Sequence, residues 1–128
     1  MPLFAELSKR HVRRIANAAR QKRFQPNTAI VRQGERGETF FVILDGTARV
    51  ESARHRLRRL GTGDFFGELA LFDGGPRSAT ITAETEVLTM RLSRRAFLDL
   101  VKNDRDLALA LLKGLSARLR QAAPSETC

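Results

Sequence analysis

The residues best suited to chemistry lie together in one stretch, residues 66–80, which reads Phe-Gly-Glu-Leu-Ala-Leu-Phe-Asp-Gly-Gly-Pro-Arg-Ser-Ala-Thr. The guanidinium of Arg77 presents a planar fork of N–H donors that matches two oxygens of a phosphate. The carboxylate of Glu68 repels phosphate, so a site that holds both side chains must offer Glu68 another partner. A sugar hydroxyl is the natural candidate. The stretch therefore predicts a pocket for a phosphate attached to a sugar.

The backbone of this stretch also suits an anion. Gly67 has no β-carbon, so the chain there can approach a ligand closely. Residues 68–72 are expected to form about one helical turn, whose free N–H groups would point at the anion. Pro76 fixes its own φ and turns the chain into Arg77, after which the hydroxyl of Ser78 offers one more donor.

This stretch resembles the phosphate-binding cassette of cyclic-nucleotide-binding domains, which occur in regulatory subunits of cAMP-dependent protein kinase, in cyclic-nucleotide-gated channels and in the catabolite activator protein. The likeness covers roughly residues 3–120. Residues 32–38 resemble the family's loop before a central hairpin. Glycines fall where the family places turns, at Gly34, Gly46, Gly61 and Gly67.

The resemblance implies roles for particular residues. Arg77 would bind the cyclic phosphate, Glu68 the ribose 2′-hydroxyl, and Ser78 would lie near both phosphate and base. Val50 and Arg118 are implied as parts of a base pocket or lid. The implied ligand is cAMP, with cGMP as the alternative, and neither a metal nor another cofactor is expected. The full set of implied ligand-binding residues is Gly67, Glu68, Leu69, Ala70, Leu71, Arg77, Ser78 and Ala79.

The periodicity of apolar residues predicts the elements that position these side chains. A helix should begin at Ser8, end near Ala19 and present one apolar stripe. A second helix should begin at Ser93, and a third should span 105–120. Short strands separated by glycine turns are expected at 29–32, 38–44, 47–51, 55–60, 79–83 and 87–92.

These elements predict an α+β, mainly β fold. We expect an antiparallel β jelly-roll barrel with an N-terminal helix, a short phosphate-cassette helix and two C-terminal helices. Residues 1–121 are expected to form one cyclic-nucleotide-binding domain, followed by a disordered tail at 122–128.

The last helix carries leucines at four-residue steps, and Leu109 and Leu112 widen its apolar face. Gly114 lies mid-helix, where glycine costs about 1 kcal/mol relative to alanine, so we expect a bend or close packing there. The resemblance implies a lid over the base or a dimer seam, and packing against the barrel is the third option. The chain is therefore expected to be a monomer, or a homodimer through this helix. The stepped leucines are Leu107, Leu111, Leu115 and Leu119.

The composition and charge of the chain limit the kind of protein it can be and where it is found. The chain has 128 residues with 23 Lys and Arg against 14 Asp and Glu, a net charge of +9 that would attract an anionic ligand. No apolar run approaches the length of a membrane span, and the N-terminus lacks an apolar signal core. The single cysteine, Cys128, cannot form an internal disulfide. We expect a cytoplasmic protein.

Two other functional classes compete. The positive charge allows a basic nucleic-acid-associated regulatory protein of the same fold. The residues end before the helix-turn-helix of the related transcription regulators, so sequence-specific DNA binding is not expected. An enzyme on a cupin-like barrel would need a ligand cluster, and only His11 and His55 are present. We therefore expect no enzyme, but a sensor whose effector protein or domain is unknown.

The expected mechanism is a population shift. Ligand would neutralise Arg77, draw the cassette inward and change the packing of Leu71 against the helix at 93–102. The C-terminal helices would then close over the base, because the ligand favours the closed arrangement.

Overall fold

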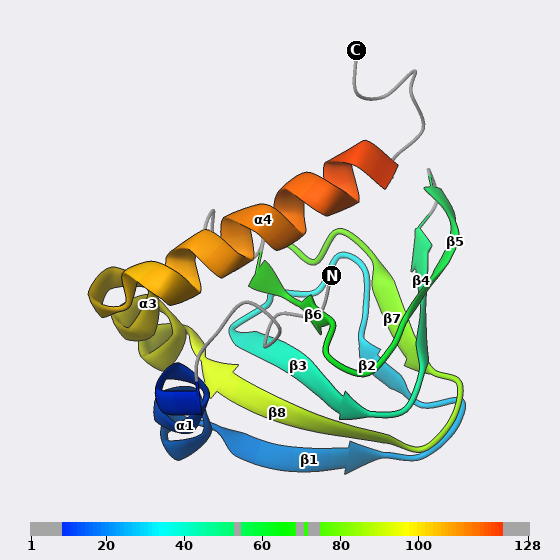
Figure 1. Ribbon diagram of the computed structural model, residues 1–128. Helices are drawn as coiled ribbons and strands as arrows, with labels where there is room; N and C mark the ends of the chain where they lie inside the picture. The colour runs from blue at the N-terminus through cyan, green and yellow to red at the C-terminus, as the bar shows by residue number, and fades with distance from the viewer. Residues whose placement is uncertain (1–8, 53–54, 69–70, 72–74, 122–128) are drawn as a thin grey trace.

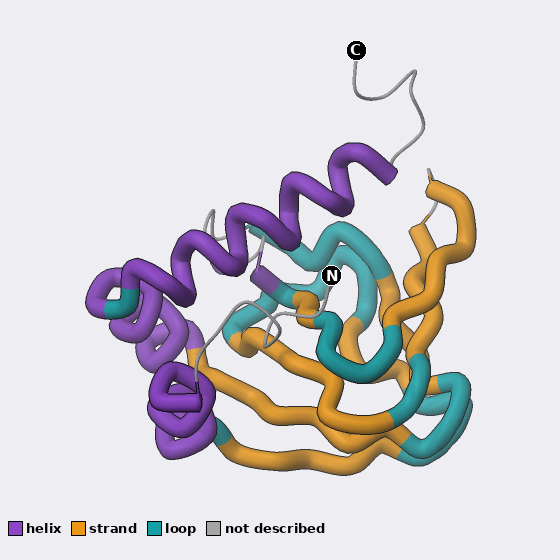
Figure 2. The backbone as a smooth tube through the Cα atoms, viewed as in Figure 1, coloured by secondary structure: helices purple, strands orange, loops and turns teal. Residues whose placement is uncertain are grey.

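The computed structural model describes residues 9–52, 55–68, 71 and 75–121. Helices α1 (Lys9–Ala18), α3 (Arg94–Asn103) and α4 (Arg105–Gln121) lie on one side of the molecule, and the strands form the rest (Figures 1 and 2). The helix predicted to begin at Ser8 corresponds to α1. The predicted cassette helix and the predicted tail at 122–128 fall largely or wholly outside the described residues. Of the described helices, none is long and apolar enough to cross a membrane.

The strands form two four-stranded sheets, and every strand pair within them is antiparallel. The first sheet has the order β1-β8-β3-β6, and the second has the order β2-β7-β4-β5. The members of the first are β1 (Arg20–Phe24), β8 (Val87–Ser93), β3 (Thr39–Asp45) and β6 (Phe65–Phe66). Those of the second are β2 (Ala29–Val31), β7 (Thr80–Ala83), β4 (Ala48–Ser52) and β5 (His55–Leu60).

The prediction of a mainly β, antiparallel fold is confirmed, and the predicted jelly-roll barrel is not closed among the described strands. Within the described residues the eight strands form two separate sheets, and no ladder joins one sheet to the other. Alternating apolar residues and glycine turns specify antiparallel strands with a buried face. They do not specify whether the outermost strands pair, which is what closure requires.

Strand β3 of the first sheet is buried on both faces. Phe41 and Ile43 pack toward the second sheet, in a cluster with Phe66, Ile81 and other residues. Their neighbours in β3 point the opposite way, as side chains alternate along a strand, and join a cluster with the helices. This helix-side cluster contains Ile15, Phe40, Val42, Phe65, Leu71, Met90, Leu92, Phe97, Leu100, Leu107, Ala110 and Leu111. The cassette residue Leu71 therefore belongs to the core that carries α3 and α4.

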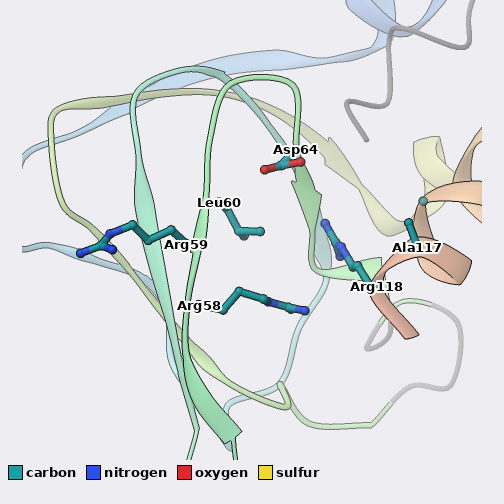
Figure 3. Close-up of a pocket in the computed structure, with 7 residues that line it drawn as sticks. Arg58, Arg59, Leu60, Asp64, Ala117 and Arg118 are labelled. Carbon is teal, nitrogen blue, oxygen red and sulfur yellow. The ribbon is translucent and has the colours of Figure 1, made fainter. Parts of the chain in front are cut away.

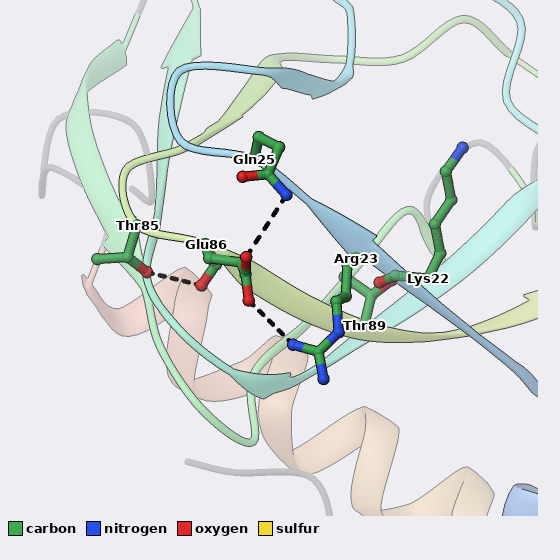
Figure 4. Close-up of polar contacts among 6 residues, drawn as sticks. All are labelled: Lys22, Arg23, Gln25, Thr85, Glu86 and Thr89. Atoms are coloured by element: carbon green, nitrogen blue, oxygen red, sulfur yellow. Dashed lines mark hydrogen bonds and ion pairs between the residues drawn. The ribbon is translucent and has the colours of Figure 1, made fainter.

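Strand β1 was not predicted, because it reads Arg-Gln-Lys-Arg-Phe and buries only its last residue, Phe24. This strand is held in place by β8, with which all five of its residues pair (Figure 4). The buried Thr89 donates from Oγ1 to the Lys22 carbonyl at 2.9 Å. Glu86 accepts from Arg23 at 3.0 Å, so tertiary contacts hold a strand that has no apolar alternation of its own.

The C-terminal helices are capped and closely packed. Ser93 accepts from the Ala96 N–H at 3.2 Å and caps α3, as predicted. Asp104 accepts from the Leu107 N–H at 3.1 Å at the start of α4. Gly114 lies against Phe65, since a β-carbon there would be 2.6 Å from the ring, which confirms close packing at this glycine. Leu109 and Leu112, which widen the apolar face of the helix, do not pack in the core: both are exposed, as is Leu119.

Candidate functional site

Hydrogen bonds hold both the main chain and the guanidinium of the buried Arg77. Its N–H donates to the Glu35 carbonyl at 2.8 Å, and its own carbonyl accepts from Gly34 at 2.9 Å. Its guanidinium donates from Nη2 to the Thr39 carbonyl at 2.8 Å and from Nη1 to the Gly67 carbonyl at 3.1 Å. Burial lowers the pKa of Arg77 and the charge of Glu68 opposes the shift, but a guanidinium stays protonated in proteins.

Two glycines make room for this guanidinium. A β-carbon at Gly37 would overlap the end of the Arg77 side chain. A β-carbon at Gly67 would lie 2.7 Å from Arg77 Nη1 and 2.6 Å from the Thr39 carbonyl. Gly67 also has a φ of +94°, which other residues rarely adopt. The glycine predicted at the start of the cassette is thus required by Arg77, and Gly37 shares that task without having been predicted.

Glu68 is buried, and one of its two carboxylate oxygens has a hydrogen-bond partner among the described residues. Only 3% of the residue is exposed. Its Oε1 accepts from Arg118 Nη1 at 3.1 Å, while its buried Oε2 has no hydrogen-bond partner among the residues that the structure describes. Burial raises the pKa of the Glu68 carboxyl, while the charge of Arg118 and the backbone N–H of Glu68 oppose the rise. A buried acceptor without a donor is costly, so a donor brought to Oε2 would stabilise this arrangement.

Arg118 joins α4 to this carboxylate. Besides its bond to Glu68, it donates from Nη2 to the Phe65 carbonyl. Its guanidinium carbon lies 4.1 Å from the centroid of the Phe65 ring, a cation–π arrangement. Burial lowers the pKa of Arg118, and the charge of Glu68 opposes that shift. One residue of the last helix therefore contacts both the cassette and β6.

A pocket of about 220 Å³ lies between β5 and α4 beside this contact. Arg58 extends from β5 toward the α4 side, whereas Arg59 points away (Figure 3) and donates to Glu84 at 2.9 Å. The lining of the pocket is mostly polar. Its lining residues are Arg58, Arg59, Leu60, Asp64, Gly114, Ala117 and Arg118.

The structure brings together four of the predicted site residues: Gly67, Glu68, Arg77 and Arg118. The other predicted residues have different surroundings. Leu71 is fully buried in the helix-side core, and its carbonyl accepts from Arg94 Nε at 3.2 Å. Ser78 is exposed, Ala79 is half-buried, and Val50 packs against the inter-sheet cluster outside the pocket lining. Leu69 and Ala70 lie outside the described residues.

Several contributing residues were missed by sequence reasoning. Thr39 and Phe65 accept hydrogen bonds through their backbone carbonyls. Because every residue has such a carbonyl, the residue type could not indicate this role. Arg58 and Arg94 were not predicted as site residues. For Gly37, its place in the Arg-Gln-Gly-Glu-Arg-Gly-Glu loop was the available signal.

Fold and site together define a ligand-binding module with a buried carboxylate beside a buried arginine. The family model described as cyclic nucleotide-binding domain matches residues 21–104. The chain belongs to the cyclic nucleotide-binding domain family.

Related proteins agree with this assignment. The chain is 36% identical over 126 residues to a cyclic nucleotide-gated potassium channel of Rhizobium etli, covering 98% of this chain and 35% of the channel. It is 34% identical over 106 residues to a cAMP-dependent protein kinase regulatory subunit of Mycosarcoma maydis, covering 76% of this chain and 20% of that protein. The chain thus spans about a third or less of these relatives. The solved catabolite activator protein of Thermus thermophilus matches with a TM-score of 0.81 and 28% identity, covering 94% of this chain and 59% of that one.

Proposed function

We propose that this chain is a sensor module that binds a cyclic mononucleotide, with cAMP as the ligand and cGMP as the alternative. The observation that carries the proposal is the unpartnered Oε2 of Glu68, buried next to the glycine that seats Arg77. A ribose 2′-hydroxyl would donate to Oε2. No negatively charged group alone would suit this atom, so the ligand must present a hydroxyl as well as a phosphate.

Arg77 supplies the anion contact. A guanidinium has five N–H donors, and backbone carbonyls accept from its two terminal nitrogens. The remaining donors are available to the oxygens of a cyclic phosphate. The two carbonyls fix the plane of the fork before ligand arrives, which lowers the entropic cost of binding.

The regulatory output would pass through α3 and α4. Leu71 packs in one core with Phe97 and Leu100 of α3, and Arg94 binds its carbonyl. A ligand that draws the cassette inward would therefore move Leu71 and change its contacts with α3. We propose that the ligand favours the arrangement in which α4 closes over the base, and that an effector protein or domain reads this change.

The exposed leucines of α4 support a homodimer over a monomer. Leu109, Leu112 and Leu119 are spaced three and seven residues apart on the exposed side of the helix, the spacing of a coiled-coil seam. Light scattering after size-exclusion chromatography should give twice the chain mass, and the mass of one chain would refute the dimer.

The nucleic-acid alternative has less support. Surface arginines pair with carboxylates, as in Arg23–Glu86, Arg49–Glu51 and Arg59–Glu84. These pairs neutralise part of the positive surface, so any binding to nucleic acid should be weak and should fall steeply with added salt.

The test is a calorimetric titration of the chain with cAMP, cGMP and 5′-AMP. The proposal expects one cyclic nucleotide to bind, and 5′-AMP to bind much more weakly, because its phosphate is not held against the ribose in a ring. Equal affinity for 5′-AMP and cAMP would contradict the proposal, as would no binding at all.

A further inference from the structure

His11 of α1 lies between two carboxylates that come from the other end of the chain. Its Nδ1 is 2.7 Å from Oδ2 of Asp104, and its Nε2 is 2.9 Å from Oδ2 of Asp106. His11 and Asp104 are 93 positions apart in the sequence. Both ring nitrogens therefore lie at hydrogen-bonding distance from an acceptor.

The two carboxylates belong to the corner where α3 meets α4. Asp104 directly follows α3, and its Oδ1 accepts from the Leu107 N–H at 3.1 Å in the first turn of α4. Asp106 lies in that same first turn. Figure 1 shows α1 below α3, at the end of the molecule where α4 begins. His11 thus connects α1 to the corner of the two C-terminal helices.

The apolar packing of α1 is limited. Of its side chains that the structure describes, only that of Ile15 is buried. The helix contains no acidic residue and several exposed basic ones. A contact between His11 and the carboxylates of the corner therefore offsets positive charge in α1 and adds to its small apolar contact. The exposed basic residues of α1 are Lys9, Arg10, Arg13 and Arg14.

The two contacts of His11 together require a protonated ring. A neutral imidazole has one N–H donor, and its other nitrogen can only accept. A carboxylate has no hydrogen to donate, so an unprotonated ring nitrogen beside it meets repulsion and forms no bond. The imidazolium form donates from both nitrogens, and its positive charge strengthens both bonds.

The charged groups around His11 act in opposite directions. Asp104 and Asp106 favour the imidazolium, whereas Arg14, whose charge acts on Asp104, opposes it. The Asp104 side chain is only 1% exposed, so its bond is shielded from solvent, while Asp106 is 59% exposed and its bond is weakened by screening. The other charged residues of these helix ends are exposed, namely Lys9, Arg10, Arg13, Lys102 and Arg105.

We propose that His11 is a proton-dependent latch: its protonated ring ties α1 to both Asp104 and Asp106, and loss of the proton releases one of the two bonds. Histidine ordinarily exchanges this proton between about pH 5 and pH 8. Because the imidazolium makes the extra bond, the stability that the latch adds is present on the acid side of this range and is lost as the pH rises through it. The latch uses none of the residues proposed to bind nucleotide, so the inference is independent of the proposed function.

The experiment follows the melting temperature of the unaltered chain, H11Q and H55Q from pH 5.5 to pH 8.5, where aspartates ordinarily stay ionised. His11 and His55 are the only histidines in the sequence, so H55Q is the matched control for loss of an imidazole. Glutamine keeps an N–H group that can donate to Asp104, but it takes up no proton.

At pH 5.5 the unaltered chain should melt about 3–8 °C above H11Q, the effect of one further bond between charged groups in a chain of this size. At pH 8.5 the difference should shrink to about 2 °C or less, because only one bond remains in either chain. The melting temperature of H55Q should change with pH as that of the unaltered chain does.

D106N tests the second bond, because it changes an exposed side chain and leaves the buried bond to Asp104 in place. It should reduce the change in melting temperature between pH 5.5 and pH 8.5. Hydrogen exchange locates the effect: at pH 6 the amides of α1 should exchange faster in H11Q than in H55Q, and by a larger factor than the amides of β3.

Melting temperatures of H11Q and the unaltered chain that change in parallel with pH would overturn the latch. A D106N chain with the full pH-dependent change would also overturn it, and this comparison decides the matter if H11Q does not fold. A pH-dependent difference that both substitutions reduce would support the latch. None of these measurements involves nucleotide, so failure of the latch leaves the proposed function intact, and the cAMP titration tests that function separately.

Discussion

Replacing Gly37 by alanine should disable the phosphate site without touching a ligand-binding side chain. The new methyl group would overlap the Arg77 guanidinium. This guanidinium is the end of a flexible side chain, so it should move while the backbone stays. The φ of Gly37 is not among the positive values in this chain, so alanine fits the local backbone.

The magnitude follows from the bonds that the movement breaks. Arg77 would lose its bonds to the carbonyls of Thr39 and Gly67, which now fix its plane. A hydrogen bond with a charged partner contributes about 1.5–3 kcal/mol. Loss of one such bond to the phosphate lowers affinity about 10- to 150-fold.

The assay is calorimetric titration of G37A with cAMP, with thermal unfolding to verify the fold. G61A is the matched control, because a β-carbon at Gly61 meets nothing within 4 Å, and its affinity should equal that of the unaltered chain. If G37A and G61A bind cAMP with affinities within a factor of two of each other, the present position of the Arg77 guanidinium is not required for binding.

Two further predictions concern the helices. D104N should lower the free energy of unfolding by about 1–3 kcal/mol, because the buried Asp104 accepts from His11 Nδ1 at 2.7 Å and from the Leu107 N–H. Burial acts to raise the pKa of Asp104, but those two hydrogen bonds and the charges of His11 and Arg14 together hold the pKa below its usual value of 3.8. The benefit is therefore complete above about pH 4 and lost as the pH falls through the lower folded value. Urea denaturation between pH 5 and pH 2 should show the difference from D104N shrinking, and a growing difference would contradict it. G114A should destabilise the chain and weaken cAMP binding, because overpacking against Phe65 costs about 1–3 kcal/mol and outweighs the gain of about 1 kcal/mol in helix propensity. An increase in melting temperature in G114A relative to an S116A control would show that α4 does not lie on that ring.

Much of the fold could be predicted from local patterns. Alternation and glycine turns marked six strands, and Ser93 marked the start of α3. The exposed, basic β1 has no such alternation, and β6 is only two residues long, so neither was visible. Both are fixed by their partners, β8 and β3, and not by their own residues.

The site shows the same division between local and long-range information. Arg77, Glu68 and Gly67 form a recognisable run in sequence. The contact of Arg118 with Glu68 joins residues 50 positions apart and depends on how α4 crosses Phe65. The leucines of α4 likewise reveal an amphipathic helix, but only packing decides that Leu107 and Leu111 are buried and Leu109 is exposed.

The most direct test of the central claim compares cAMP binding by the unaltered chain and by R77A in calorimetry. A buried phosphate deprived of its cation should lose about 2–5 kcal/mol of binding free energy, which is about 30- to 4,000-fold in affinity. R77A should show this loss, and the control R32A should not, because Arg32 is an exposed arginine that pairs only with the exposed Glu35 among the described contacts. An affinity of R77A equal to that of R32A would contradict the claim that Arg77 holds the cyclic phosphate.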